Sequence, residues 1–306
     1  MDSSGKTEPL VTAPATYAGP RFSPDGKRLA LAVYAGGYDV FVYDRQSDVL
    51  SRLTSGGGQN YSRVWSPDGE HLVFESDRAD GSRLNWIRAD GSGETQVLLK
   101  SKNNSGPSGF SPDGRRLAYG ELKPDGDADL WTLPLDTSDP EHPKPGKPEP
   151  FLQTRLSRGG WYSLPTAAML PICQMSQEGM RSTCGLLRDQ NGKSGPGKWQ
   201  VSTGGGKYPV WSPNGREIFY RGLDNRIMVA DYTTTGGSFS VSKPCAWSDG
   251  QIRAVGAALN FALAPDGKRF AVFPMPEAAA EDKGAVQVTF LLNFFDELRR
   301  KVPAGK

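Results

Sequence analysis

The chain has 306 residues, of which 37% are hydrophobic and 23% are charged, a balance typical of a folded globular protein. Lys and Arg number 36 against 34 Asp and Glu, a formal net charge of +2, and no basic block or acidic tail indicates a nucleic-acid or membrane-surface partner. The longest apolar run, VQVTFLLNFF at residues 286–295, is about half the length of a membrane-spanning helix. The opening residues, MDSSGKTEPL, lack the apolar core of a secretory signal, so the sequence as written predicts a cytoplasmic location.

One turn pattern, Pro-Asp-Gly or Pro-Asn-Gly, recurs five times along the chain. Pro presets φ for the first corner of a turn, Asp or Asn caps the backbone, and Gly accepts a positive φ. Alternating apolar residues follow each turn, which is the period of a β-strand. Each copy therefore predicts a β-hairpin. The copies are RFSPDGKRLALAVY from residue 21, VWSPDGEHLVFES from 64, GFSPDGRRLAYGE from 109, VWSPNGREIFYRG from 210 and ALAPDGKRFAVFP from 262.

A third and a fourth strand follow these hairpins, and no helical pattern separates one unit from the next. DVFVYD from residue 39 and RLNWIRAD from residue 83 are examples of the third strand, and TQVLLKS from residue 95 is an example of the fourth. Serial units of four antiparallel strands are typical of propeller blades around a channel. The large residues before the turns, Phe22, Trp65, Phe110 and Trp211, are expected to pack between blades.

The spacing of the turns shows that one unit has lost its signature. The turn residues are Ser23, Ser66, Ser111, Ser212 and Ala264, so the intervals are 43, 45, 101 and 52 residues. The double interval contains LPTAAMLPICQMSQEGMRSTCGLL at residues 164–187, with three of the six Met and two of the three Cys.

We interpret segment 163–190 as a possible frameshift, because another reading frame of plausible codons gives a turn and strand like those of the second unit. Two alternatives remain open: Met filling of an irregular blade, or a soft-metal site. Metal binding would use Met169, Cys173, Met175, Met180 and Cys184. These spacings contain no C-x-x-C pair and no histidine is near. The sequence therefore predicts no metal site and no cofactor.

The predicted architecture is an all-β, six-bladed β-propeller of four-stranded antiparallel blades, one of them disrupted, that occupies residues 1–306 as a single domain. Residues 8–12 are expected to form the outer strand beside residues 286–293, which closes the ring and removes an exposed edge. A short C-terminal helix, FFDELRRK from residue 294, and a tail should follow, with residues 296–306 outside the blades. The predicted blades span residues 18–57, 58–104, 105–155, 156–206, 207–250 and 251–295.

Catalytic signatures are sparse. His71 and His142 lie far apart and neither has a recognisable acid–base setting, and the chain has no G-x-S-x-G nucleophile motif. The turn carboxylates are each expected to cap their own turn rather than bind calcium. The turn carboxylates are those of Asp25, Asp68, Asp113 and Asp266. The sequence therefore predicts a protein that is not an enzyme.

The SPDGKRLA-type hairpins with third strands such as DVFVYD resemble the WD40-like repeats of TolB-type β-propellers. GKWQVSTGGGKYPVWSPNGREIFYR and VTFLLNFFDELRRKVP further resemble the C-terminal propeller of receptor-like serine/threonine protein kinases of Acidobacteria. This resemblance implies a bacterial sensor domain, extracytoplasmic in the longer relatives. The kinase motifs G-x-G-x-x-G-x-V, H-R-D and D-F-G are absent, so a kinase label would be inherited from those relatives.

The function predicted is a non-enzymatic interaction or sensory module, a fragment of such an ectodomain, that binds an unknown protein or small ligand at the propeller face. Tyr61, Arg63, Tyr208 and Asn260 precede or begin innermost strands and are candidates for a channel rim. One alternative is a lactonase or hydrolase that needs acidic side chains converging at one channel end. Another is a TolB-like translocation partner, which would require export.

Overall fold

The computed structural model describes most of residues 1–275, and Met1–Met275 forms one compact unit. The backbone is described except at residues 12–14, 56–58, 112, 125–127, 153–171, 177–180, 187–196, 236–237, 254–259 and 276–306. In addition, only the backbone and not the side chain is described at residues 62, 128, 152, 172–176, 181–186, 197–200, 234–235 and 238. All regular structure in the described part is strand, with no helix.

The first three sheets follow one another along the chain. Each is antiparallel, because consecutive strands are joined by short turns. The first contains β1 (Thr16–Phe22), β2 (Arg28–Tyr34), β3 (Tyr38–Asp44) and β4 (Val49–Arg52), and the second contains β5 (Gln59–Trp65), β6 (His71–Arg78), β7 (Gly81–Arg88) and β8 (Gln96–Ser101). The third contains β9 (Asn104–Phe110), β10 (Arg116–Leu122), β11 (Ala128–Asp136), β12 (Lys144–Pro145) and β13 (Glu149–Leu152).

Three more sheets continue the series. The fourth contains β14 (Ile172–Ser176), β15 (Arg181–Leu186) and β16 (Gly197–Gln200). The fifth contains β17 (Lys207–Trp211), β18 (Glu217–Arg221), β19 (Arg226–Thr235), β20 (Ser238–Val241) and β21 (Cys245–Gln251). The sixth contains β22 (Phe261–Leu263) and β23 (Phe270–Val272).

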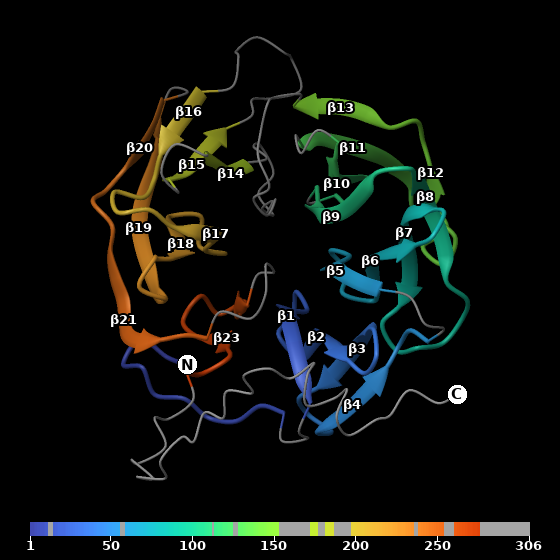
Figure 1. Cartoon of the computed structure of the whole chain (residues 1–306), viewed down its shortest axis with the longest axis horizontal. Coiled ribbons are helices and arrows are strands. Elements are labelled where there is room, and N and C mark those ends of the chain that lie inside the picture. The colour runs from blue at the N-terminus through green and yellow to red at the C-terminus, as the bar shows by residue number, and fades with distance from the viewer. Residues whose placement is uncertain are drawn as a thin grey trace, which may run out of the picture. The chain divides into compact units, whose positions relative to one another are not determined.

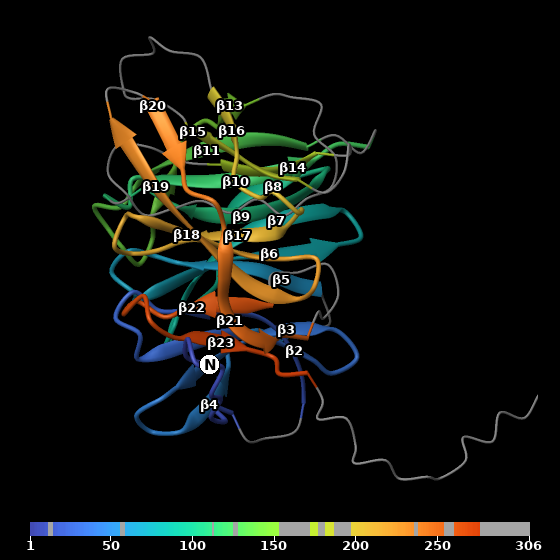
Figure 2. The same ribbon diagram turned by 90° about the vertical axis from the view of Figure 1, so that its left-hand side faces the viewer.

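Within Met1–Met275 these sheets are arranged around a centre, with β1, β5, β9, β14 and β17 as the inner strands (Figure 1). From the side, the inner strands run along the axis of the ring (Figure 2). β1 contacts both β5 and β22, so the first sheet lies between the second and the last. The fold is an all-β propeller.

Four complete blades, and not six, are seen in the described residues. The first, second, third and fifth sheets have four or five strands, whereas the fourth has three and the sixth has two. The prediction of six four-stranded blades is therefore corrected to four complete blades and two smaller sheets among the described residues. Most of segment 163–190 lies outside the described residues, and only the backbones of β14 and β15 are described there.

The predicted outer strand at residues 8–12 is wrong for its described part, because residues 8–11 form no strand. Pro9 lacks the backbone N–H that a ladder position would use. Met1 makes the contact instead: its nitrogen donates to the carbonyl of Phe270 in β23, and the Phe270 N–H donates to the Met1 carbonyl, both at 2.8 Å. Residues 286–293 and the predicted helix and tail lie outside the described residues.

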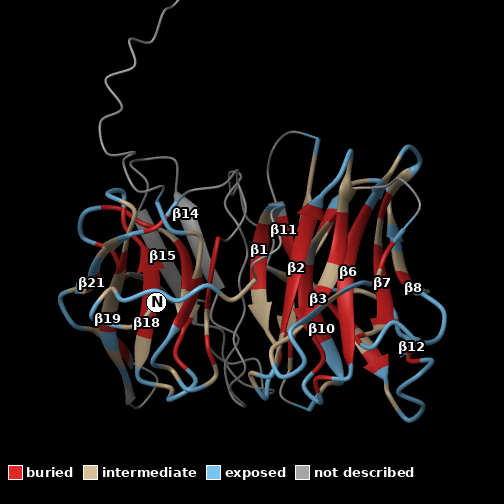
Figure 3. Ribbon diagram, turned by 90° about the horizontal axis from the view of Figure 1, so that it is seen from below, coloured by how far each residue is buried: buried red, intermediate tan, exposed pale blue. Residues whose placement is uncertain are grey.

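The core lies between neighbouring sheets, where strand residues are buried (Figure 3). Trp65 packs with Ala30 and Val40 of the first sheet and with Leu72 and Phe74 of the second. Trp65 and Phe110 lie between blades as expected, because each belongs to a core cluster drawn from two neighbouring sheets. Trp211 is buried among residues of its own fifth sheet and Val201, and Phe22 is half-buried against a cluster from the first and last sheets. Each sheet of the ring packs between two neighbouring sheets, so both of its faces are buried. This explains the runs of consecutive buried residues in β2 and β6.

The Pro-Asp-Gly turns stack on one another around the ring. Gly69 has a φ of 75°, and a β-carbon there would lie 3.3 Å from Cδ of Pro24 in the preceding turn. The same relation joins Gly26 to Pro265, at 3.2 Å, and therefore links the first turn to the last. Gly114 faces Pro67 in the same way, and Gly267 faces Pro213.

Candidate functional site

The ring has two ends with different chemistry. Because successive hairpin turns of an antiparallel sheet lie at opposite ends, the Pro-Asp-Gly turns share one end, here named the turn end. The other end, named the rim end, holds the starts of the inner strands and the turns between β2 and β3 and between β6 and β7.

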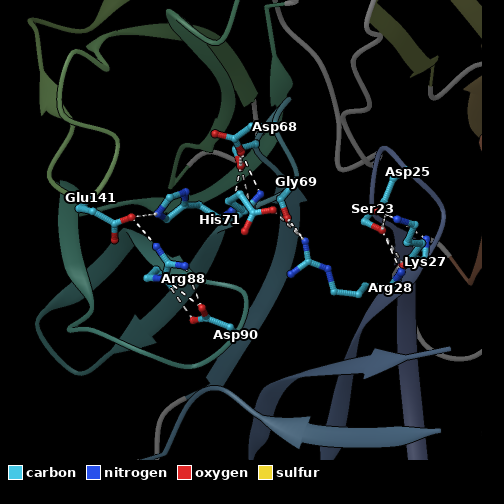
Figure 4. Close-up of polar contacts among 12 residues, drawn as sticks. Ser23, Asp25, Lys27, Arg28, Asp68, Gly69, His71, Arg88, Asp90 and Glu141 are labelled. Atoms are coloured by element: carbon cyan, nitrogen blue, oxygen red, sulfur yellow. Dashed lines mark hydrogen bonds and ion pairs between the residues drawn. The ribbon is translucent and has the colours of Figure 1, made fainter. Parts of the chain in front are cut away.

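The turn end is occupied by self-contained hydrogen bonds. Ser23 Oγ donates to Asp25 Oδ1 at 2.6 Å and accepts from the Arg28 N–H at 2.9 Å (Figure 4). The hydroxyl of Ser23 lowers the pKa of Asp25, and the hydroxyl of Ser111 lowers that of Asp113. Each carboxylate also accepts the N–H two residues on, as at Lys27. The prediction that these aspartates cap their own turns is confirmed, since the same holds at Asp68 and Asp266.

His71 also belongs to the turn end, where it is part of a packed ion-pair cluster. Its ring is only 2% exposed and stacks on Trp86 with centroids 4.6 Å apart. Nε2 of His71 lies 3.6 Å from Oε1 of Glu141, which Arg88 also reaches at 2.5 Å while bonding Asp90 at 2.8 Å (Figure 4).

The loop that carries Glu141 is fastened to the second sheet. Trp86 Nε1 donates to the Pro140 carbonyl at 3.1 Å and Gln96 Nε2 donates to the Pro143 carbonyl at 2.8 Å. His142, in the same loop, is exposed and lies 3.3 Å from Asp139. Neither histidine contacts a nucleophile among these interactions. The cluster therefore has a structural role, which is to hold the loop with Glu141 against the second sheet.

Tyr61 and Arg63 both lie on β5, at a bulge near the rim end. Arg63 is buried, and its Nη2 donates to the carbonyls of Ala18 and Gly19 in β1, the latter contact being very short. Burial, with a smaller effect of Arg21, lowers the pKa of Arg63 to about 9. The buried Arg63 therefore connects the first two sheets through hydrogen bonds, whereas Tyr61 is partly exposed.

Tyr208 belongs to β17 of the fifth sheet, and Asn260 directly precedes β22 of the sixth. Tyr208 is 6% exposed and Asn260 is fully buried. Tyr208 has a φ of 57° at the bulge of β17, and the guanidinium carbon of Arg221 lies 5.0 Å from its ring centroid. Burial raises the pKa of the Tyr208 hydroxyl. The four candidates thus do not form one site, because β5 and β17 lie on opposite sides of the centre (Figure 1).

The sequence analysis missed two tyrosines that join Tyr61. Tyr34 and Tyr38 face each other across the β2–β3 turn, with ring centroids 5.2 Å apart, and Tyr38 lies 5.4 Å from Tyr61. Tyr34 is 49% exposed. The three residues, named here the tyrosine cluster, offer a contiguous aromatic surface at the rim end. The sequence YAGGY, an aromatic pair around a glycine turn, was the signal for the first two.

A buried carboxylate lies at the same corner of the rim. Asp39, next to Tyr38, accepts hydrogen bonds from Arg52 at 2.5 Å, from Thr54 at 2.7 Å and from Asn60 at 2.9 Å. Gln59 Oε1 accepts from the Tyr38 N–H at 3.3 Å and contacts the Tyr61 hydroxyl at 3.1 Å. These bonds hold the hairpin of Tyr38 against the start of β5.

The described residues contain no group of three or more His, Cys, Asp or Glu side chains placed to hold a metal ion. Cys245 is an exposed free thiol. Nothing helical in the described part of the chain reaches the length and apolarity that a bilayer crossing demands.

Known proteins resemble part of this chain in sequence. Residues 2–141 match the family model of the TolB beta propeller domain. An uncharacterized protein of Agrobacterium fabrum is 31% identical over 142 residues, which cover 44% of this chain and 45% of the relative. The Tol-Pal system protein TolB of Helicobacter hepaticus is 29% identical over 104 residues, 34% of this chain and 25% of the relative. The matches thus span less than half the length of these relatives.

Solved structures extend the likeness in fold. TolB from Acinetobacter baumannii aligns with a TM-score of 0.55 at 15% identity, over 77% of this chain and 56% of that one. A putative TolB from Agrobacterium tumefaciens gives 0.56 at 19% identity, over 86% and 92%. An oligogalacturonate lyase in complex with manganese gives 0.53 at 16% identity, over 76% and 66%. At such identities the likeness concerns the fold alone. Residues 2–141 are therefore similar in sequence to the TolB beta propeller domain, and the chain as a whole shares its propeller fold with solved TolB structures.

Proposed function

We propose that the chain is a non-enzymatic β-propeller interaction module that binds a partner protein at the rim end through the tyrosine cluster. The observation that carries this proposal is the contiguous surface of Tyr34, Tyr38 and Tyr61. The ring centroids lie 5.2 Å apart between Tyr34 and Tyr38 and 5.4 Å apart between Tyr38 and Tyr61. Tyr side chains are enriched at the energetic centres of protein interfaces, because they combine a large apolar area with a polar tip.

The surroundings of the cluster support a preformed binding surface. Asp39, Thr54 and Asn60 are buried and hydrogen-bonded directly behind it. Gln59 Oε1 accepts from the Tyr38 backbone N–H and from the Tyr61 hydroxyl, so the backbone of Tyr38 and the ring of Tyr61 are held before a partner arrives. A surface that loses little freedom on binding gains affinity.

Triple substitution of the cluster tests the proposal. The variant Tyr34→Ser, Tyr38→Ser, Tyr61→Ser and the wild-type chain are used as bait in crosslinking capture from the source cell, with quantitative mass spectrometry. We expect the proteins enriched by the wild type to fall at least about tenfold with the variant, since aromatic anchors contribute about 2 kcal/mol or more each.

Val97→Ser serves as the matched control, because Val97 is 39% exposed on the outer strand β8. It should capture the same proteins as the wild type. Identical captured sets for all three baits, with thermal unfolding showing each of them folded, would refute the proposal.

The enzymatic alternative requires acidic side chains that converge with a metal ion. No specific contact favours it, since the described residues offer no such group. A panel of lactones and uronate oligomers, assayed with and without Mn²⁺, tests it directly, and turnover would replace the proposal above.

The association with a receptor-like kinase, the sensory role and the translocation role also remain proposals. DNA upstream of the first codon decides the first, because a kinase domain and a membrane helix should be encoded there in frame. Translating the codons of residues 158–199 in all frames tests the frameshift, which predicts that one alternate frame restores a Pro-Asp-Gly-type hairpin.

A further inference from the structure

A cavity of about 420 Å³ lies where the first and last sheets meet, away from the tyrosine cluster. This volume is within the range of small-molecule pockets. Its walls are strand residues of β1, β2 and β23 and the non-strand segment of residues 7–11. The apolar lining includes Leu10, Tyr17, Phe22, Leu31 and Phe270.

Two arginines line this mainly apolar cavity, and both come from the turn end. Arg45 follows β3, and Arg269 lies in the turn before β23. Glu8 lines the cavity as well. Arg269 is paired with Asp266 at 2.8 Å.

Arg45 differs from Arg269 because it has no ion pair among the described residues. Its Nη1 donates to the Gly26 carbonyl at 2.8 Å, and its guanidinium carbon lies 5.9 Å from the ring centroid of Phe22. Its Nε is buried and has no hydrogen-bond partner in the described part of the chain. A half-buried guanidinium without a counter-charge is destabilising, and a bound carboxylate would satisfy both its charge and its N–H groups.

We propose that this cavity binds a free aliphatic monocarboxylate, with the carboxylate at Arg45 and the hydrocarbon chain against Leu10, Leu31 and Tyr17. Charge lies at the turn end and apolar surface along the strands, so the polarity of the cavity matches that of an amphipathic anion. The site is separate from the proposed protein-binding surface, and neither proposal depends on the other.

Calorimetric titration of the full chain with decanoate, and with decanol as an uncharged analogue, tests the proposal. Decanoate should bind at least about tenfold more tightly than decanol, which is the factor expected for a charge-assisted hydrogen bond. Arg45→Gln should lower the affinity for decanoate by about tenfold and leave that for decanol unchanged. Leu10→Asn, in the half-exposed segment that lines the cavity, should weaken both ligands.

Arg115→Gln is the matched control, since Arg115 is an exposed arginine in the turn of the third sheet. It should bind decanoate as the wild type does, and so should the triple tyrosine variant. If Arg45→Gln does not fold, the wild-type affinities for decanoate and decanol and the loss of both in Leu10→Asn carry the test. Absence of decanoate binding to the wild type, equal binding of decanoate and decanol, or equal loss in Arg115→Gln and Arg45→Gln would each overturn the proposal.

Discussion

The turn end and the rim end of the ring are built on opposite principles. At the turn end the same residues recur from sheet to sheet, and each aspartate or asparagine bonds within its own turn, as at Asp25, Asp113 and Asn214. At the rim end equivalent positions differ: Gly19, Tyr208 and Asn260 all lie four residues before a turn residue. The repeated end maintains the ring, and the varied end is free to carry a specific surface.

The difference also concerns the range of the contacts. Ser23, Asp25 and Arg28 interact within six residues of sequence. Asp39 and Asn60, by contrast, are 21 residues apart and belong to different sheets. Substitutions of exposed rim side chains should therefore change partner binding, whereas substitutions of turn residues or of the buried Asp39 should change the stability of the ring.

The largest effect is expected at the buried carboxylate of the rim. Asp39→Ala removes the acceptor for Arg52, Thr54 and Asn60, and should lower the free energy of unfolding by about 3 kcal/mol, because buried donors are left without partners. Urea denaturation measures this. The control Asp80→Ala, at a side chain 70% exposed and paired with Arg83, should change it by less than about 1 kcal/mol. Equal losses would show that the Asp39 network is not structural.

The stacking of turns is tested by two glycines with nearly the same backbone. Gly69 and Gly36 have φ values of 75° and 78°, but only at Gly69 would a β-carbon meet a neighbour, Pro24. Gly36→Ala should cost about 1 kcal/mol from the left-handed conformation alone. Gly69→Ala should cost about 1 kcal/mol more, since the turn must move. Chemical denaturation of both variants gives the difference, and a difference of zero would contradict the stacking of turns.

A smaller effect is expected from pH at the turn end. The Ser23 hydroxyl and the Lys27 N–H hold the pKa of Asp25 below its usual value of 3.8. A depressed folded-state pKa contributes stability above the unfolded-state pKa, and this contribution is lost as the pH falls through the folded-state value, hence below about pH 4. In Ser23→Ala the pKa of Asp25 should rise toward 3.8. Carboxyl NMR titration measures it, with Asp113 as an internal reference that must not move.

The smallest effect on stability is expected at the tyrosine cluster. Tyr34→Ser should change the free energy of unfolding by no more than about 0.5 kcal/mol, because the side chain is 49% exposed. The same variant should still weaken partner capture. A large destabilisation would mean that the cluster is part of the fold and would weaken the functional proposal.

Sequence predicted the hairpins, the third strands and the position of Trp65 and Phe110 between sheets. It failed at the outer strand of residues 8–11, where Pro9 lacks the backbone N–H that a ladder position needs. It named Tyr61 but not Tyr34 and Tyr38. That cluster depends on packing between two sheets.

The turns and the strand periods follow from local sequence, because Pro, Asp and Gly act on dihedral angles and hydrogen bonds within a few residues. The contact of Gly26 with Pro265, the bonds of Arg63 to the neighbouring sheet and the position of Arg45 in a mainly apolar cavity are visible in the folded ring alone. Each of these contacts joins residues far apart in the chain, and their pairing depends on how the ring brings neighbouring sheets together.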